Sequence, residues 1–247
     1  SEFVGPHPIV WRGFRVWKGC LGDKPCVIRA LETNTRYKDR NLNELRCHML
    51  AAKTTEYAAP ILALRNTMEP LESLKEMESG GRCLAVVMPE LEPMEGWVET
   101  PTQAVELLRQ MLEFLAAMST VLLTHRDLSP SNLLRYPDTG QLCVIDWELA
   151  QIGDPVRDLG WLCVNSWRFG NNTLPVGGFG TVEDLLAGYQ DTTGIFVSTA
   201  EVTFWQVFGS FWWAMATLQM AGAWRSGDTP SLERPVIGRR SSEAQMD

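Results

Sequence analysis

Two acidic side chains and one amide stand out in the middle of the chain because of their types and spacing. Asn132 comes five residues after Asp127, and Asp146 ends an apolar run. Phosphoryl transfer from ATP needs one acid that orients the acceptor hydroxyl, and it needs an amide and a second acid that hold magnesium on the phosphates. We therefore predict catalysis by Asp127, Asn132 and Asp146, with ATP and Mg²⁺ as cofactors and Asn132 and Asp146 as metal ligands. Two unrelated turns that happen to carry these residues are the alternative.

Composition narrows the class of protein. The 247 residues suffice for one compact domain of two lobes, and 45% of them are hydrophobic. The net charge of -8 and the pI near 5.0 argue against a nucleic-acid partner. Six cysteines without a C-x-x-C pair favour buried reduced thiols over a zinc site. Without a segment typical of a secretory signal peptide, we expect a cytoplasmic protein.

The first third of the chain predicts a small antiparallel sheet with one helix. Residues 8–12, 14–20 and 26–32 have the pattern of short strands, and residues 83–88 form a further buried strand. Apolar residues at helical spacing predict a helix over 39–52. Gly80 and Gly81 mark a turn before the last strand.

The remainder predicts a mainly helical region. Thr100 and Gln103 have the spacing of a helix cap, and the helix that follows has one apolar face, formed by Val105, Leu108, Leu112 and Leu115. A hairpin turns at residues 137–140, and helices follow over 157–165, 182–192 and 199–224. Residues 202–224 of the last helix include no charged residue, and we interpret this run as a core helix rather than a membrane span. The polar tail after it is expected to be partly disordered.

The second half of the sequence resembles the aminoglycoside phosphotransferase and choline kinase-like family of the kinase-like superfamily. The resemblance rests on Ile145-Asp146-Trp147-Glu148, Gly153-Asp154-Pro155 and Asp158-Leu159-Gly160-Trp161. It implies that Asp146 binds metal and that Asp158 holds the catalytic loop through hydrogen bonds. An acid at a helix N-terminus is a second reading of Asp158.

The first half resembles the small lobe of eukaryotic-type serine/threonine kinases, through Val16-Trp17-Lys18-Gly19 and the residues around it. His125-Arg126-Asp127 likewise has the protein-kinase arginine. The resemblance implies an α+β, two-lobed, protein-kinase-like fold. Residues 1–92 would form the nucleotide-binding small lobe, and residues 93–247 the helical lobe with the catalytic loop, metal site and acceptor site. ATP is expected between the lobes, with Met88, Glu90 and Leu91 at its adenine.

Two departures weaken the enzyme interpretation. Arg29 stands where the superfamily has a phosphate-binding Lys, and the two side chains are not equivalent at a tight site. Its partner would be Glu44, which could equally form a capping box with Asn41. Only Gly13 and Gly19 remain of the glycine-rich loop, so it is either a weak phosphate loop or a plain hairpin.

Three functions remain open on these residues. The first is transfer of the γ-phosphate to a hydroxyl of a small-molecule acceptor, because Gly153 follows Asp146 too closely to leave room for an activation segment. The second is a serine/threonine protein kinase, which His125-Arg126-Asp127 supports. The third is a catalytically impaired pseudokinase that acts as a binding module, which Arg29 suggests.

Overall fold

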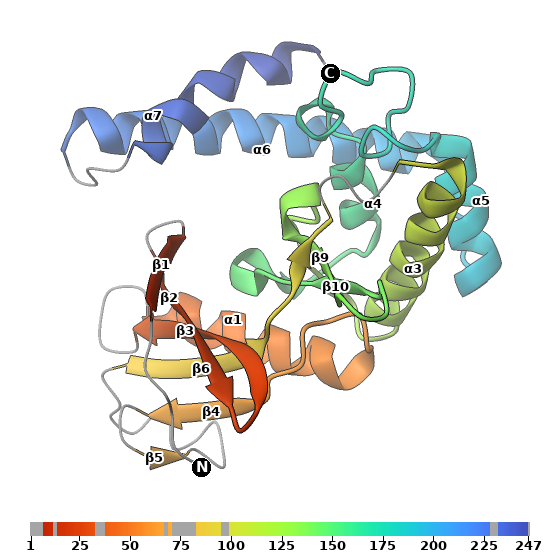
Figure 1. Ribbon diagram of the computed structural model, residues 1–247. Coiled ribbons are helices and arrows are strands. Elements are labelled where there is room, and N and C mark those ends of the chain that lie inside the picture. The colour runs from red at the N-terminus through yellow and green to blue at the C-terminus, as the bar shows by residue number, and fades with distance from the viewer. Residues whose placement is uncertain are drawn as a thin grey trace. The chain divides into compact units, whose positions relative to one another are not determined.

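The chain forms two compact units in this computed structural model, which describes residues 7–11, 14–32, 38–66, 69–70, 83–94, 99–227 and 232–246 (Figure 1). The first unit contains Ser1–Pro93 and Leu134–Gln151, and the second contains Met94–Leu133 and Ile152–Asp247. Antiparallel strands dominate the first unit and helices dominate the second. The division into lobes at residue 92 stays a prediction. In the structure, Leu134–Gln151 packs with the first unit.

A six-stranded antiparallel sheet forms most of the first unit. Its strands are β1 (His7–Trp11), β2 (Phe14–Leu21), β3 (Lys24–Glu32), β4 (Ala63–Asn66), β5 (Glu69–Pro70) and β6 (Cys83–Pro89). Their spatial order is β1-β2-β3-β6-β4-β5. The turn between β2 and β3 has Gly22 at φ 63°, a conformation that glycine adopts without a steric cost. Arg29 of β3 pairs with Val86 of β6, so strands on both sides fix its backbone.

Helix α1 (Lys38–Thr54) contributes its apolar side chains to the core of this unit. The core cluster contains Leu31, Leu42, Leu45 and Val86. The helix begins before Asn41, so the capping box predicted for Asn41 and Glu44 is wrong. Both residues lie within the helix, and Glu44 is only 3% exposed. The prediction failed because spacing alone does not show where a helix begins.

A second, smaller sheet has the order β10-β9-β7 and consists of β7 (Glu92–Pro93), β9 (Leu133–Arg135) and β10 (Leu142–Val144). The predicted hairpin turn lies between β9 and β10, with Gly140 at φ 69°. The segment that follows α1 is bonded to β10: Val144 donates to the Tyr57 carbonyl at 2.6 Å, and Ala59 donates to the Val144 carbonyl at 3.2 Å. These bonds fix the end of β10, two residues before Asp146.

The second unit begins with α3 (Pro101–Thr120), whose predicted cap is confirmed. The Thr100 hydroxyl accepts from the Gln103 backbone, and the Gln103 side chain accepts from the Thr100 backbone. The predicted apolar face is wrong at Val105, which is 69% exposed. The face that packs is rotated from it, and its buried apolar residues are Leu107, Met111, Leu112, Phe114, Leu115 and Met118.

Three further helices complete the core of this unit: α4 (Val156–Leu162), α5 (Val182–Thr193) and α6 (Thr199–Arg225). Helix α3 contacts α5, and α4 packs against α6. The short elements of the chain are β8 (Leu123–Thr124), η1 (Pro130–Asn132), η2 (Trp147–Leu149), β11 (Gln151–Ile152) and η3 (Asn165–Trp167). Trp161, Trp167 and Trp213 are buried together, with neighbouring ring centroids 5.0 and 5.4 Å apart.

Helix α6 is apolar on all sides but buried on one side only. Val202, Gly209, Trp213 and Thr217 lie in the core. The opposite side exposes six large apolar residues: Phe204, Val207, Phe208, Phe211, Met215 and Leu218. The interpretation as a core helix therefore holds for half of its surface. Among the residues the structure describes, no helix is both long and apolar enough to cross a membrane.

The described part of the polar tail, residues 232–246, is largely helical. Helix α7 (Glu233–Gly238) and the 3-10 segment η4 (Arg239–Met246) both pack against α6. The guanidinium of Arg240 lies 5.5 and 5.3 Å from the ring centroids of Trp167 and Trp213 and donates to the Ser166 carbonyl at 2.9 Å. A cation on aromatic faces thus helps to anchor a segment whose composition alone indicates no core.

We predict that the contact between α4 and α6 depends on Gly160. A Cβ atom at this position would lie 2.4 Å from the Trp205 Cβ and 2.7 Å from the Gln206 backbone nitrogen. Because the helix backbone cannot yield easily, Gly160→Ala should lower the free energy of unfolding by about 2–3 kcal/mol.

Gly222→Ala is the matched control, because a Cβ there meets nothing within 4 Å. It should raise the free energy of unfolding by about 0.5–1 kcal/mol, the difference in helix propensity. Urea unfolding of both variants measures these changes, and equal stability of the two would contradict the proposed close contact.

Candidate active site

A buried carboxylate organises the loop that carries Asp127. Asp158 in the first turn of α4 is 1% exposed, and its two oxygens accept hydrogen bonds from the backbone nitrogens of His125 and Arg126, both at 2.7 Å. Burial raises the pKa of Asp158, and these two donors and Arg157 oppose that shift. The expectation that Asp158 holds the loop is confirmed. The second reading also holds, because Asp158 lies in the first turn of α4.

The same bonds hold an unusual backbone conformation. Arg126 has φ 68°, which is uncommon for a residue with a Cβ and costs free energy. A residue in that conformation persists only when its surroundings determine it. Here the bond from its own nitrogen to Asp158 supplies that constraint, and Asp127 follows immediately.

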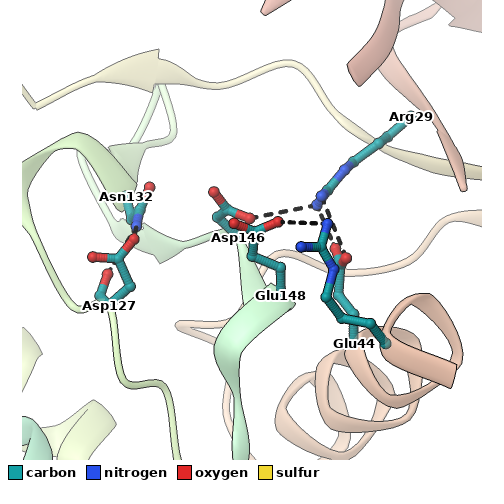
Figure 2. Close-up of polar contacts among 7 residues, drawn as sticks. Arg29, Glu44, Asp127, Asn132, Asp146 and Glu148 are labelled. Carbon is teal, nitrogen blue, oxygen red and sulfur yellow. Dashed lines mark hydrogen bonds and ion pairs between the residues drawn. The ribbon is translucent and has the colours of Figure 1, made fainter. Parts of the chain in front are cut away.

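Asp127 and Asn132 lie together, as their spacing predicted. The Asn132 amide nitrogen donates to the Asp127 carbonyl at 2.8 Å and to the Asp127 Oδ2 at 3.0 Å (Figure 2). Asn132 follows Pro130 in the 3-10 turn η1, and its backbone nitrogen bonds to the Ser129 carbonyl. The turn therefore bends the chain back, so that the Asn132 side chain orients the Asp127 carboxylate.

The amide oxygen of Asn132 is the group that fits a metal ion. The residue is 1% exposed, and no residue in the described part of the chain donates a hydrogen bond to its Oδ1. A buried polar atom without a partner is costly, so such atoms commonly have a role. An amide oxygen beside a carboxylate is a hard donor of the kind that Mg²⁺ prefers.

Asp146 belongs to the first unit and lies two residues beyond β10. Its φ of 66° is left-handed, which Asp tolerates better than most residues. Its Oδ1 lies 3.7 Å from the Nη1 of Arg29 (Figure 2). The following Trp147 is buried and stacks on His48, with ring centroids 6.0 Å apart. This packing fixes the turn that sets the direction of the Asp146 carboxylate.

Arg29 and Glu44 form a nearly buried ion pair, so the pairing interpretation of Glu44 is confirmed over the capping box. Arg29 Nη1 donates to Glu44 Oε1, and Nη2 lies 3.3 Å from Oε2 (Figure 2). The two side chains are 13% and 4% exposed. The Nη1 and Nη2 atoms of Arg29 each contact one carboxylate oxygen. A Lys, which has one nitrogen, could not make this two-point contact.

Burial raises the pKa of Glu44 to about 7, and Arg29 opposes the shift. Asp146 and Glu148 add to it, because their negative charges disfavour a third one nearby. Arg40, 3.4 Å from Glu148, lowers the Glu44 pKa in turn. The ion pair of Arg40 and Glu148 was not predicted from the sequence. The position of Glu148, two residues after Asp146, was the signal that could have indicated it.

The residues expected at the adenine lie at the end of β6 and just after it. Met88 packs against the core cluster of the first unit, and Glu90 pairs with Lys18 of β2. Leu91 is partly exposed. Gly19 lies in β2 opposite Cys26, whereas Gly13 and the turn predicted at Gly80 and Gly81 fall outside the described residues. A nucleotide-binding role for these positions stays a prediction.

Residues 119–192 match the phosphotransferase enzyme family. The matched segment contains Asp127, Asn132, Asp146 and Asp158, and it confirms the family resemblance that the second half of the sequence indicated. The comparisons thus support a phosphotransferase. A comparison with curated proteins gave no match.

The whole chain is similar in structure to a candidate aminoglycoside phosphotransferase of Ralstonia eutropha. The TM-score is 0.68 and the sequence identity 18%, over 98% of this chain and 90% of that one. At this identity the likeness establishes the fold alone. It confirms the predicted kinase-like α+β fold, with a small antiparallel sheet and a mainly helical part. The likeness of the first half to serine/threonine kinases stays a prediction.

Asp158→Asn tests the constraint on the catalytic loop. An amide has one acceptor oxygen, so one of the two backbone donors loses its partner, and a buried unsatisfied donor costs about 1–3 kcal/mol. We expect a loss of that size in the free energy of unfolding and faster hydrogen exchange at the His125 and Arg126 amides. Asp191→Asn, on an exposed part of α5, should change neither. Unchanged exchange at both amides in Asp158→Asn would contradict this account.

Glu44 should make stability depend on pH. Its folded pKa of about 7 exceeds its ordinary value of 4.5, so the folded chain binds the proton more tightly than the unfolded chain. Its contribution is complete below pH 4.5 and is lost as pH rises through 7. Relative to Glu44→Gln, the wild type should lose up to about 3 kcal/mol between pH 4.5 and 8. Urea unfolding across this range measures the difference; a constant difference would refute the shifted pKa.

Proposed function

We propose that the protein transfers the γ-phosphate of ATP, in the presence of Mg²⁺, to a hydroxyl of a small-molecule acceptor. The observation that carries this proposal is the bonded pair of Asp127 and Asn132, in which the Asn132 amide orients the acid and the Asn132 Oδ1 meets no donor among the described residues. The family match over this segment supports the transferase class, and the acceptor and cofactors are part of the proposal.

Each candidate residue has a role in this reaction. Asp127 accepts or orients the proton of the acceptor hydroxyl, and the bond from Asn132 fixes the direction of its carboxylate. Asn132 and Asp146 hold magnesium, which neutralises charge on the phosphates during transfer. Arg29 contacts the phosphates and is held by Glu44. Met88, Glu90 and Leu91 border the adenine. Catalysis comes from positioning and charge neutralisation, without a covalent protein intermediate.

A small acceptor fits better than a protein substrate. Between Asp146 and the start of α4 at Val156 the chain has only the short elements η2 and β11. Protein kinases have a long activation segment there that binds the substrate peptide. A serine/threonine protein kinase is thus the second candidate, supported by His125-Arg126-Asp127 and by the resemblance of the first half to the small lobe of such kinases.

A pseudokinase that binds without catalysis is the third candidate. Arg29 in place of Lys is its support, because a guanidinium engaged by Glu44 and near Asp146 is less available to phosphates. The presence of Asp127, Asn132 and Asp146 favours the enzyme instead.

Thermal-shift titration with ATP, with and without magnesium, separates these functions. A ligand that binds only the folded state raises its melting temperature with concentration. We expect a magnesium-dependent rise that is lost in Asp146→Ala and kept in Asp127→Asn. Transfer to a panel of small alcohols, measured as ADP release, should fall at least about 100-fold in Asp127→Asn.

Asp191→Ala is the matched control and should behave as the wild type in both measurements. Absence of any shift at millimolar ATP would overturn the nucleotide-dependent proposal. Magnesium-dependent binding with no transfer to small alcohols or to a generic protein substrate would favour the pseudokinase.

A further inference from the structure

A second arginine lies beside the catalytic loop of the helical unit, and none of the roles above uses it. The guanidinium of Arg157 lies over the rings of Trp205 and Phe208, 5.4 and 5.0 Å from their centroids. The two rings contact each other edge to face, with their centroids 5.5 Å apart. Aromatic faces attract a cation and restrict its motion, so Arg157 is held in place without an ion pair.

Within the part of the chain that the structure describes, no residue accepts a hydrogen bond from the guanidinium of Arg157. The two neighbouring carboxylates are engaged elsewhere: Asp158 with His125 and Arg126, and Asp154 with the Val156 nitrogen at 2.9 Å and the Trp205 Nε1 at 3.1 Å. A planar fork of donors with no acceptor is suited to a carboxylate or a phosphate of a ligand.

The environment leaves Arg157 charged at neutral pH. Its pKa is lowered to about 10, mainly by burial and also by the nearby charge of Arg126, while Asp158 opposes the shift. Both the loss of hydration and the repulsion from Arg126 would be relieved by an anion.

The exposed aromatic face and an apolar groove on the same helix share Phe211. Phe204, Phe208 and Phe211 are spaced by four and three residues, so they share one exposed face of α6. The groove, of about 540 Å³, is lined by Val207, Phe211 and Leu218 of α6 and by Ser241 and Ala244 of η4. None of its lining residues is charged. An exposed apolar face of this extent in a soluble unit commonly marks a binding surface.

We propose that Arg157 and this face of α6 bind the acceptor, which is an apolar small molecule carrying a carboxylate or a phosphate. The anionic group bonds to the guanidinium of Arg157, and the apolar body lies along Phe208, Phe211 and the groove. Arg157 directly precedes Asp158, which holds the loop with Asp127, so the acceptor is bound beside the catalytic loop. The identification of this ligand as the acceptor rests on the proposed function. The binding of the ligand can be measured without nucleotide and is tested separately.

Titration calorimetry with octanoate, octylammonium and inorganic phosphate tests the proposal on the full chain without ATP. We expect saturable binding of octanoate, weaker binding of phosphate, and no binding of octylammonium, which has the same chain but opposite charge. Arg157→Met should bind octanoate at least tenfold more weakly, and Arg157→Lys should retain part of the affinity. Phe211 is 63% exposed, and Phe211→Ser should weaken the binding of octanoate without changing the binding of phosphate.

Arg225→Met is the matched control, because this exposed arginine ends the same helix outside the aromatic cluster. It should bind octanoate as the wild type does. Circular dichroism melting checks that each variant folds. If Arg157→Met does not fold, the comparison of the wild type with Arg157→Lys is the test.

Several outcomes would overturn the proposal. Equal octanoate affinity in the wild type and Arg157→Met would assign the arginine to packing alone, and equal binding of octylammonium would remove the charge selection. Binding of phosphate without octanoate would leave an anion site but no apolar acceptor. A dimer that Phe211→Ser dissociates, together with no octanoate binding, would assign the face to protein association. Loss of ATP binding with intact octanoate binding would refute only the proposed phosphotransfer.

Discussion

A carboxylate without access to water is costly in a protein core unless hydrogen bonds satisfy both of its oxygens. Asp158 meets this condition through two consecutive backbone donors, at His125 and Arg126. The carboxylate stabilises the loop, and the loop satisfies the carboxylate. Because the bonds fix a left-handed residue directly before Asp127, the position of the proposed catalytic acid follows from a group that takes no part in the chemistry.

The first unit uses the opposite strategy for its charged groups. Arg29 is held by a carboxylate with a raised pKa, and acids at Asp146 and Glu148 crowd the same small volume. Such an arrangement is electrostatically strained, because three acids share few cations. A cation or a change of protonation would relieve it.

The sequence predicted what depends on neighbours in the chain. Asp127 and Asn132 share one turn, and Thr100 caps its helix three residues away, so spacing alone was sufficient. The sequence did not predict the exposure of Val105 or the position of Arg157 over Trp205, because these depend on which face of a helix meets another segment. Apolar character on every side of α6 likewise gave no sign of which side packs.

The chain passes from one compact unit to the other three times, after Pro93, Leu133 and Gln151. The first unit is therefore discontinuous, and its last segment includes β10 and Asp146. During synthesis, this unit cannot complete its fold when residue 93 leaves the ribosome; it must wait for Gln151. The second unit in turn needs the segment around Arg240 to cover its tryptophans. Neither unit can therefore be obtained by a single cut of the chain, and the first unit is expected to complete its fold before the second.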